Sequence, residues 1–499
     1  MSARGSRSPR NRDPAGNLKQ RSLRGGAIVL AAEGVRAVVV VGYLGTIARL
    51  LTPADFGVVA MSMAVLWVLV PLSTMGLSVA AVQTPDLTDE ALNAVFWASL
   101  AFASVLALAA VLAAPLVGLL YRRPELVAIT RVLSVVLLIN GLAAAPSAIL
   151  RRQLRFGVLS GLEFGSLVIS AGAALLAAAA GLGHWSLVLH ELTLHASIMA
   201  GAWVFCGWRP GAPGGAAVLG PLLDYGRPLT AFRVLESVRA QFDRFLVGMT
   251  VSPAALGSYT AASNLLLRIM RRMIGPVSGV AVSSLARLQE APREFCDHYR
   301  LSVLWAMTLS LPVVSFVALE PDLVVVGLLG AQWTDAIPIF WILALGSPAV
   351  LLRPATNWVL QAIGRPDRQL RWAWVEVFTY LAAFLLAVRW GVLGIAAAST
   401  VVAYVTLVPR TVYSFRHSPV GARDLLTGIW RPVGAILLSG TAWVSLPLAV
   451  QTASPTVSLG LSILAFLAIY GSCWLLLPGG RREARDALRS TFSRGQVRE

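Results

Sequence analysis

Apolar stretches of about 20 residues follow one another along almost the whole chain, separated by short polar segments. A helix of that length crosses the hydrocarbon layer of a bilayer. Proline and glycine mark many of the breaks between the stretches. We predict fourteen membrane-spanning helices, at residues 27–49, 57–82, 92–120, 127–149, 157–180, 184–206, 229–250, 255–281, 301–319, 336–362, 373–389, 392–414, 432–450 and 457–478. The pattern therefore predicts an all-α polytopic membrane protein.

The longest connection between the first twelve segments divides them into two sets of six. It begins with a Gly- and Pro-rich stretch and ends with a short amphipathic stretch, Ala216 to Tyr225. Because six is an even number of spans, both sets start on the same side, and we expect two pseudo-symmetric six-helix lobes plus two C-terminal helices. The predicted parts are a basic tail at 1–26, an N-terminal lobe at 27–206, a linker at 207–228, a C-terminal lobe at 229–415, helices thirteen and fourteen within 416–478 and a basic tail at 479–499.

A short sequence pattern occurs once in each predicted lobe. In each copy a Glu and an Arg three positions apart lie early in an apolar segment, and a Pro-Ala-x-apolar-Gly turn follows it. The copies are Glu33 and Arg36 with residues 53–57, and Glu236 and Arg239 with residues 253–257. A further similarity links Ala114-Pro115-Leu116 with Glu320-Pro321-Asp322, near the end of the third helix of each lobe. These repeats support the prediction of two similar lobes.

Composition and charge agree with a membrane protein. Of the 499 residues, 57% are apolar and only 13% charged, whereas soluble domains carry about 25% charged residues. The net charge of +17 lies mainly in the tails and in short loops, not on an amphipathic face with aromatic residues, so we exclude a nucleic-acid partner. Arginine is enriched on the side of the membrane that holds the tails, which predicts that both termini are cytoplasmic.

Charged residues within the apolar segments are the main functional candidates, because ionisable groups in a membrane are costly. Segment seven places Glu236, Arg239 and Asp243 on one helix face. Segment eight carries Arg268, Arg271 and Arg272 at positions i, i+3 and i+4, and segment ten carries Arg353. A simpler interpretation is that each Glu and Arg pair only neutralises itself on one helix. That interpretation leaves a surplus of arginine, whose planar guanidinium suits an anionic ligand such as phosphate.

Segment six contains His190, Glu191 and His195, which superficially resemble a zinc motif. The two histidines are five positions apart, whereas zinc-binding His-Glu-x-x-His places them at i and i+4, so we predict no metal site. The group is either a proton-sensitive pair facing a cavity or a set of hydrogen-bonded packing residues. Cys206, Cys296 and Cys473 fit no disulfide or metal spacing. No outside loop is long enough for a catalytic domain, so we predict neither an enzyme nor a cofactor.

Several motifs resemble those of a known family. They are residues 47–57 (Ile-Ala-Arg-Leu-Leu-Thr-Pro-Ala-Asp-Phe-Gly), 76–83, 92–97, 151–156, 243–248, 256–259, 285–289 and 362–367, in the family's order. The chain resembles Wzx-type polysaccharide exporters of the multidrug/oligosaccharidyl-lipid/polysaccharide exporter superfamily. The resemblance implies a flippase that moves undecaprenyl-diphosphate-linked oligosaccharide across the bacterial cytoplasmic membrane by alternating access. It also implies a role in surface polysaccharide or lipopolysaccharide biosynthesis, with polysaccharide polymerase or export machinery as candidate partners.

The resemblance and the charged residues together give a set of site predictions. We expect the diphosphate to contact cavity arginines, and we expect Arg36 and Arg239 to line one cavity from opposite lobes. The substrate-binding candidates are Arg36, Arg239, Arg268, Arg271, Arg272 and Arg353; the acidic or coupling candidates are Glu33, Glu236, Asp243, His190 and Glu191. The chain has Asp243-Arg244 where the family commonly has Asp-Asn. Alternative functions are a small-molecule antiporter of the same superfamily, and a membrane glycosyltransferase or polymerase.

Overall fold

The computed structural model describes residues 35–36, 38–84, 87–213, 215–416, 418–445 and 454–480. Every regular element within these residues is helical, and the predicted all-α membrane fold is confirmed. The predicted N-terminal tail, the predicted C-terminal tail from residue 481 onward, Glu33 and the end of predicted segment thirteen lie outside the described residues.

The first described helix is Val38–Leu50. The helices that follow are α2 (Pro53–Ser73), α3 (Leu77–Gln83), α4 (Asp89–Leu120), α5 (Glu125–Leu133), α6 (Val135–Arg152), α7 (Phe156–Ala179), α8 (Trp185–Cys206), α9 (Ala216–Thr250), α10 (Pro253–Arg287), α11 (Pro292–Leu319), α12 (Pro321–Leu329), α13 (Ala336–Ala362), α14 (Pro366–Ala387), α15 (Gly391–Phe415), α16 (Ala422–Ser445) and α17 (Pro455–Leu476), with 3-10 turns at Ala331–Trp333 and Val388–Trp390. Each predicted segment overlaps a helix or a consecutive pair of helices. Segment two is divided into α2 and α3 because Met75 and Gly76 adopt positive φ angles of 45° and 68°.

Ten helical spans among the described residues are long and apolar enough to cross a membrane. The helices α9 and α10 are not among them, although each has 35 residues. Polar and charged side chains interrupt their apolar sequence, as expected for helices that line a polar cavity inside a membrane protein. Length and hydropathy alone therefore identify ten spans, and α9 and α10 bring the number nearer to the predicted fourteen.

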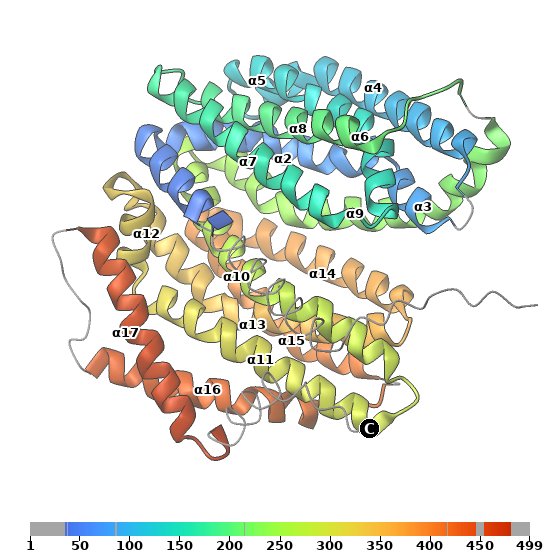
Figure 1. The fold of residues 1–499 in the computed structure, drawn as a ribbon. Helices are drawn as coiled ribbons and strands as arrows, with labels where there is room; N and C mark the ends of the chain where they lie inside the picture. The colour runs from blue at the N-terminus through green and yellow to red at the C-terminus, as the bar shows by residue number, and fades with distance from the viewer. Residues whose placement is uncertain are drawn as a thin grey trace, which may run out of the picture.

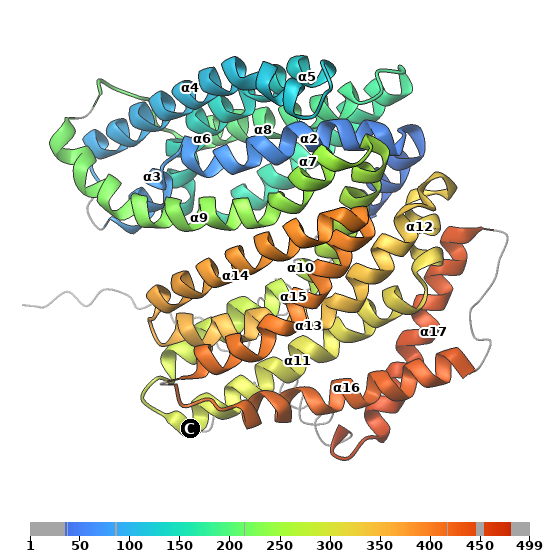
Figure 2. The ribbon, with the colours of Figure 1, turned by 180° about the vertical axis from the view of Figure 1, so that it is seen from behind.

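The helices form two groups (Figure 1), which we name the N-terminal group (α2 to α9) and the C-terminal group (α10 to α17). Within the N-terminal group α7 packs on α8 and α6 packs on α4 and α8; within the C-terminal group α13 packs on α10 and α15. The helices α16 and α17 flank α11 and α12, as Figure 2 shows from behind. The two groups meet mainly where α2 contacts α10.

The predicted linker contains the start of a long helix. The amphipathic stretch from Ala216 is the first part of α9 and continues without a break into predicted segment seven. One side of α9 packs on α2, and another packs on α14 of the C-terminal group. The helix therefore lies between the two groups, and the predicted domain boundaries stay a prediction.

The repeated Pro-Ala-x-apolar-Gly turns start α2 and α10 in the same way. In each, a hydroxyl-bearing N-cap residue (Thr52 or Ser252) accepts a hydrogen bond from the backbone N–H three positions later, and proline follows as the first helical residue. The two helices then cross at their glycines. A Cβ on Gly57 would lie 1.8 Å from the Pro253 carbonyl oxygen, and one on Gly257 would lie 1.7 Å from the Pro53 oxygen. Only glycine allows this approach, so the repeated motifs contact each other.

The third sequence similarity was aligned wrongly. Pro115 lies inside α4, whereas Pro321 begins the separate helix α12. Proline is tolerated within membrane helices and is also favoured as the first helical residue, so its presence alone does not identify an element. The structural counterpart of α12 is α5, which has nine residues like α12 and directly follows Pro124.

Candidate functional site

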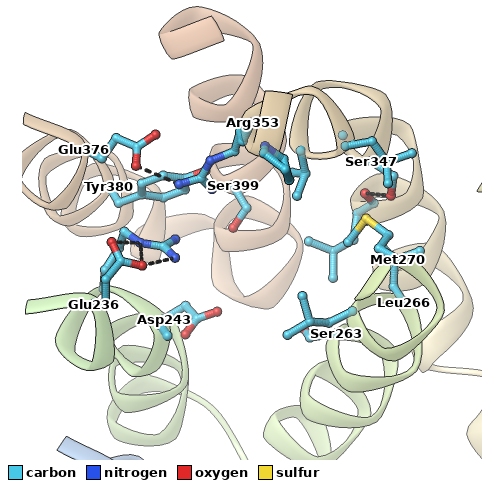
Figure 3. A pocket seen from close by; sticks show the side chains of 18 of the residues that line it. Glu236, Asp243, Ser263, Leu266, Met270, Ser347, Arg353, Glu376, Tyr380 and Ser399 are labelled. Carbon is cyan, nitrogen blue, oxygen red and sulfur yellow. Dashed lines mark hydrogen bonds and ion pairs between the residues drawn. The ribbon is translucent and has the colours of Figure 1, made fainter. Parts of the chain in front are cut away.

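The main cavity has a volume of about 460 Å³ and is lined by α9, α10, α13, α14 and α15. We name it the central cavity. Glu236, Arg239 and Asp243 all line it from α9, which confirms that they share one helix face. Figure 3 shows Glu236 and Asp243 on one side of the cavity, with Arg353, Glu376 and Tyr380 across from them. Its volume is within the range of small-molecule sites, about 300–1,000 Å³.

One wall of the cavity holds a buried carboxylate between two arginines, which we name the Glu376 triad. Glu376, only 2% exposed, accepts a hydrogen bond from Arg353 at 2.7 Å and another from Arg410. Arg410 also donates to Thr356 and Asn357, both at 2.8 Å. Three ionised side chains in a membrane interior are stable only when they are mutually paired and hydrogen-bonded. The triad therefore fixes α13, α14 and α15 to one another at this wall of the cavity.

The opposite wall, α9, holds its own ion pair. Arg239 donates to Glu236 at 3.0 Å, and its guanidinium lies 5.7 Å from the centre of the Tyr380 ring on α14. Asp243 accepts a hydrogen bond from the Tyr259 hydroxyl at 2.6 Å. Glu236 and Arg239 thus form an ion pair within one helix and also line the cavity, so the two interpretations are compatible.

Arginine exceeds acid in this lining. The described lining residues include five arginines and three carboxylates: Arg239, Arg244, Arg271, Arg353 and Arg410 against Glu236, Asp243 and Glu376. Arg244 donates to Asn264 at 2.7 Å and to Gln241, which are neutral partners. Arg271 is exposed and has no ion pair or hydrogen bond with any described residue. The cavity therefore carries surplus positive charge, with Arg271 available to a ligand.

A model of the polysaccharide biosynthesis protein family matches residues 46–338, which is more than half of the chain. The chain belongs to this family. It is 24% identical over 320 residues to the teichuronic acid biosynthesis protein TuaB of Bacillus subtilis (strain 168), over 64% of this chain and 66% of that protein. It thus spans just under two thirds of that relative's length. It is also 21% identical over 427 residues to the lipopolysaccharide biosynthesis protein WzxC of Escherichia coli (strain K12), over 80% of this chain and 83% of that protein. The resemblance seen in the sequence motifs is confirmed.

The fold of this polysaccharide biosynthesis protein matches that of a solved flippase. The lipid II flippase MurJ in an inward closed conformation superposes with a TM-score of 0.71, over 93% of this chain and all of the MurJ chain, at 11% sequence identity. At such low identity the match describes the fold only.

The structure separates the two arginines that the sequence repeat had linked. Arg36 donates to Glu163 of α7 at 3.4 Å and lies outside the lining of the central cavity. Arg239 lies within that lining. In this conformation the two residues do not share the central cavity, although their sequence environments match. Glu33, which the sequence pattern pairs with Arg36, lies outside the described part of the chain.

The arginine stripe predicted on α10 is also divided. Arg271 lines the central cavity, but Arg268 and Arg272 do not. Arg268 interacts electrostatically with Glu191 of α8 and with Tyr43 of the first helix. The helix α10 lies between the central cavity and the N-terminal group, so residues on neighbouring parts of its surface meet different surroundings.

The His190, Glu191 and His195 group forms a second, much smaller site within the N-terminal group. His195 lies 3.8 Å from Glu191, and the His190 ring stacks on Tyr43 with centroids 4.9 Å apart. Glu191 lines a cavity of about 10 Å³, which is room for about one water. No group of three His, Cys, Asp or Glu side chains within the described part of the chain could hold a metal ion.

Sequence reasoning did not identify Glu376, Arg410 or Tyr380 as candidates. The signal for the first two was present, since Glu376 lies within predicted segment eleven and Arg410 within segment twelve. The rule that selected Arg353, a charge inside an apolar segment, applies equally to both. Tyr380 carries no comparable signal, because a tyrosine in an apolar segment is ordinary.

Proposed function

We propose that this protein is a flippase for an anionic lipid-linked oligosaccharide, with undecaprenyl diphosphate as the lipid carrier. The observation that carries the proposal is the surplus of arginine in the central cavity, together with membership of a polysaccharide biosynthesis family. A sugar diphosphate cannot cross hydrocarbon without replacement of its hydration. Guanidinium groups supply that replacement through charge-assisted, often bidentate hydrogen bonds.

In the proposed mechanism each part of the cavity has a different role. Arg271, at the exposed part of the lining, contacts the diphosphate first. The charges of Arg239 and Arg353 are partly balanced by Glu236 and Glu376. When the ligand binds, each arginine transfers part of its hydrogen bonding from its glutamate to the diphosphate. The prenyl chain stays in the bilayer beside the protein. Alternating access then exposes the cavity first to the cytoplasmic side, which holds both termini, and next to the other side.

The alternatives fit the cavity less well. A transporter of cationic drugs would face repulsion from the surplus arginines. A glycosyltransferase or polymerase would need an acid positioned for catalysis, but each acid in the described lining is bonded to an arginine or a tyrosine. In this proposal a polysaccharide polymerase or export complex is a partner of the flippase, and the chain itself is not the polymerase.

We also propose that the Glu191 group carries coupling protons. Glu191 lies 3.8 Å from His195 on its own helix and interacts electrostatically with Arg268 of the C-terminal group, and Arg268 also interacts with Tyr43, on which His190 stacks. Protonation of Glu191 would remove an attraction between the two helix groups. This gives an ion gradient a direct effect on how tightly the groups associate.

The decisive experiment replaces Arg271 in a strain that lacks the chromosomal copy of the gene. The deletion should block the surface or secreted glycan and cause lipid-linked repeat units to accumulate inside. Export restored by Arg271→Gln should be about ten- to a hundredfold lower than that restored by the wild type, since a lost hydrogen bond to a charged group costs about 1.5–3 kcal/mol. Arg287→Gln, on the same helix but outside the cavity lining, is the matched control.

Two results would count against the proposal. If the deletion strain makes its glycan normally without accumulating precursor, and holds no second exporter, the flippase function is wrong. If Arg271→Gln exports as well as Arg287→Gln, the cavity arginines do not bind the transported anion.

A further inference from the structure

The repeated Pro-Ala-x-apolar-Gly motifs are not explained by the central cavity. They meet instead at the crossing of α2 and α10, where Gly57 lies on the Pro253 carbonyl and Gly257 on the Pro53 carbonyl. We name this contact the glycine crossing. We propose that the glycine crossing is a gate, which closes one end of the transport path only while the two helix groups are together. The inference rests on the proposed alternating-access function and specifies where that motion is controlled.

The crossing is a contact between two backbones, so it leaves no room for a side chain at either glycine. At 1.8 Å and 1.7 Å, an added Cβ would overlap carbonyl oxygens, which cannot rotate away as a side chain can. Small residues allow such close approach of membrane helices, and Cα–H groups can then donate weak hydrogen bonds to the facing carbonyls. A single methyl group at either glycine must therefore push α2 and α10 apart.

A second set of contacts closes the same end. Trp333 donates its indole N–H to the Ala48 carbonyl at 2.8 Å, and Gln332 donates to the Leu51 carbonyl at 2.9 Å. These carbonyls belong to the end of the first helix, where backbone acceptors lack partners within the helix. The Trp333 ring also packs edge-on against Phe56, directly before Gly57. The C-terminal group thus supplies the cap for a helix that precedes α2.

The two sets of contacts have the properties of a reversible closure. Each polar group involved can bond to water when the helix groups separate at this end, so opening leaves no donor or acceptor without a partner. The apolar contact at the glycines is short-ranged and is lost after a small separation. Because the first helix enters α2 through Leu51 and Thr52, the gate lies on the side opposite the termini in the predicted orientation.

The test measures the distance between the groups at this end, without substrate. In a variant whose Cys206, Cys296 and Cys473 are replaced by serine, spin labels are attached to cysteines introduced at Leu182 and Asp335. Both positions are exposed. Leu182 is next to Gly183, which approaches Asp55 of α2, and Asp335 follows Trp333. Pulsed electron paramagnetic resonance then reports the distribution of distances between the two helix groups.

Gly57→Ala and Gly257→Ala should each shift the population to longer distances, and the double variant should shift it further. Gly275→Ala is the matched control, because it lies on α10 and an added Cβ there meets nothing within 4 Å. Gln332→Ala, at an exposed position, should cause a smaller shift in the same direction. It also provides a readout if the glycine variants do not fold.

Unchanged distance distributions in the glycine variants would overturn the gate, and so would an unchanged distribution in Gln332→Ala if only that variant folds. A shift that Gly275→Ala reproduces would also overturn it. Since no glycan is present, this result is independent of the Arg271 experiment. Failure of the gate and failure of the flippase proposal are therefore distinguishable.

Discussion

The two helix groups differ in the size and the charge of the cavities beside and within them. Beside the C-terminal group, a cavity of about 460 Å³ is lined by eight charged side chains, whereas the N-terminal group holds a cavity of about 10 Å³ with Glu191 as its one charged lining residue. Counted from the first residue of each helix, Glu376 of α14 corresponds to Ser166 of α7, and Arg410 of α15 corresponds to Val204 of α8. The Glu376 triad thus has no counterpart at those two positions.

This difference shows that a repeated scaffold does not imply repeated chemistry. Helix starts, the short helices α5 and α12, and the glycine crossing are shared by both halves because they set the geometry of the bundle. Buried charges are not shared, because each one must be balanced by partners on other helices. A charged site can therefore be acquired by one half without the other.

The largest expected effect comes from breaking the Glu376 triad. Glu376→Ala leaves Arg353 and Arg410 buried without their carboxylate, which should cost about 3–5 kcal/mol of stability. Ser166→Ala, at the corresponding position of the N-terminal group, should change stability little. Thermal unfolding of the purified proteins in detergent compares them. Simultaneous replacement of Glu376, Arg353 and Arg410 by apolar residues should recover much of the loss, and equal stability of the two alanine variants would contradict the role given to the triad.

The next effect separates the two repeated arginines. Arg239→Lys keeps the charge in the cavity but loses the planar fork, and a loss of about 1.4 kcal/mol would reduce glycan export about tenfold. Arg36→Lys should export almost normally, because Arg36 pairs with half-exposed Glu163 outside the cavity lining. Export is compared at matched protein levels. Equal losses of export in both variants would show that both arginines contact the transported substrate. Normal export by both would show that each arginine only balances the charge of a neighbouring glutamate.

The smallest expected effect concerns the N-terminal group. Glu191→Gln removes the group proposed to carry protons, so glycan export should become less dependent on external pH while changing little in amount. Glu163→Gln is the control, since it makes the same substitution at an exposed acid in the same group. Export is measured over a range of external pH values. A pH dependence that Glu191→Gln leaves intact would make the Glu191 group a set of packing residues.

The fold was predictable from the sequence because it depends on the length of apolar segments and on where Pro and Gly interrupt them. The exceptions are local: positive φ angles at Met75 and Gly76 divide one predicted helix, predicted segment four is divided into α5 and α6, and α12 was not predicted as a separate helix. These features depend on backbone geometry that hydropathy does not report. The stripe of charged residues on α9 was also predictable, since it follows from helical periodicity alone.

The rest of the site depends on tertiary packing. Periodicity places Arg268 and Arg271 about 60° apart around α10, but only the packing shows that Arg268 interacts with Glu191 and that Arg271 lines the central cavity. Similarly, the sequence repeat aligned Arg36 with Arg239, although Glu163 on α7 binds the first and α9 presents the second to the cavity. Spacing along one helix defines a face, and the neighbouring helices define what that face does.

The glycine crossing also bears on how the two halves of this chain can change over evolutionary time. Gly57 meets Pro253 while Gly257 meets Pro53, which is the reciprocity of an isologous interface between two identical subunits. In such a homodimer one codon would determine both contacts, whereas in a single chain the two contacts are inherited separately. Each half nevertheless keeps a glycine that the backbone of the other half requires. A chimeric chain that joins the halves of two relatives will retain this contact only if both halves have preserved their glycine.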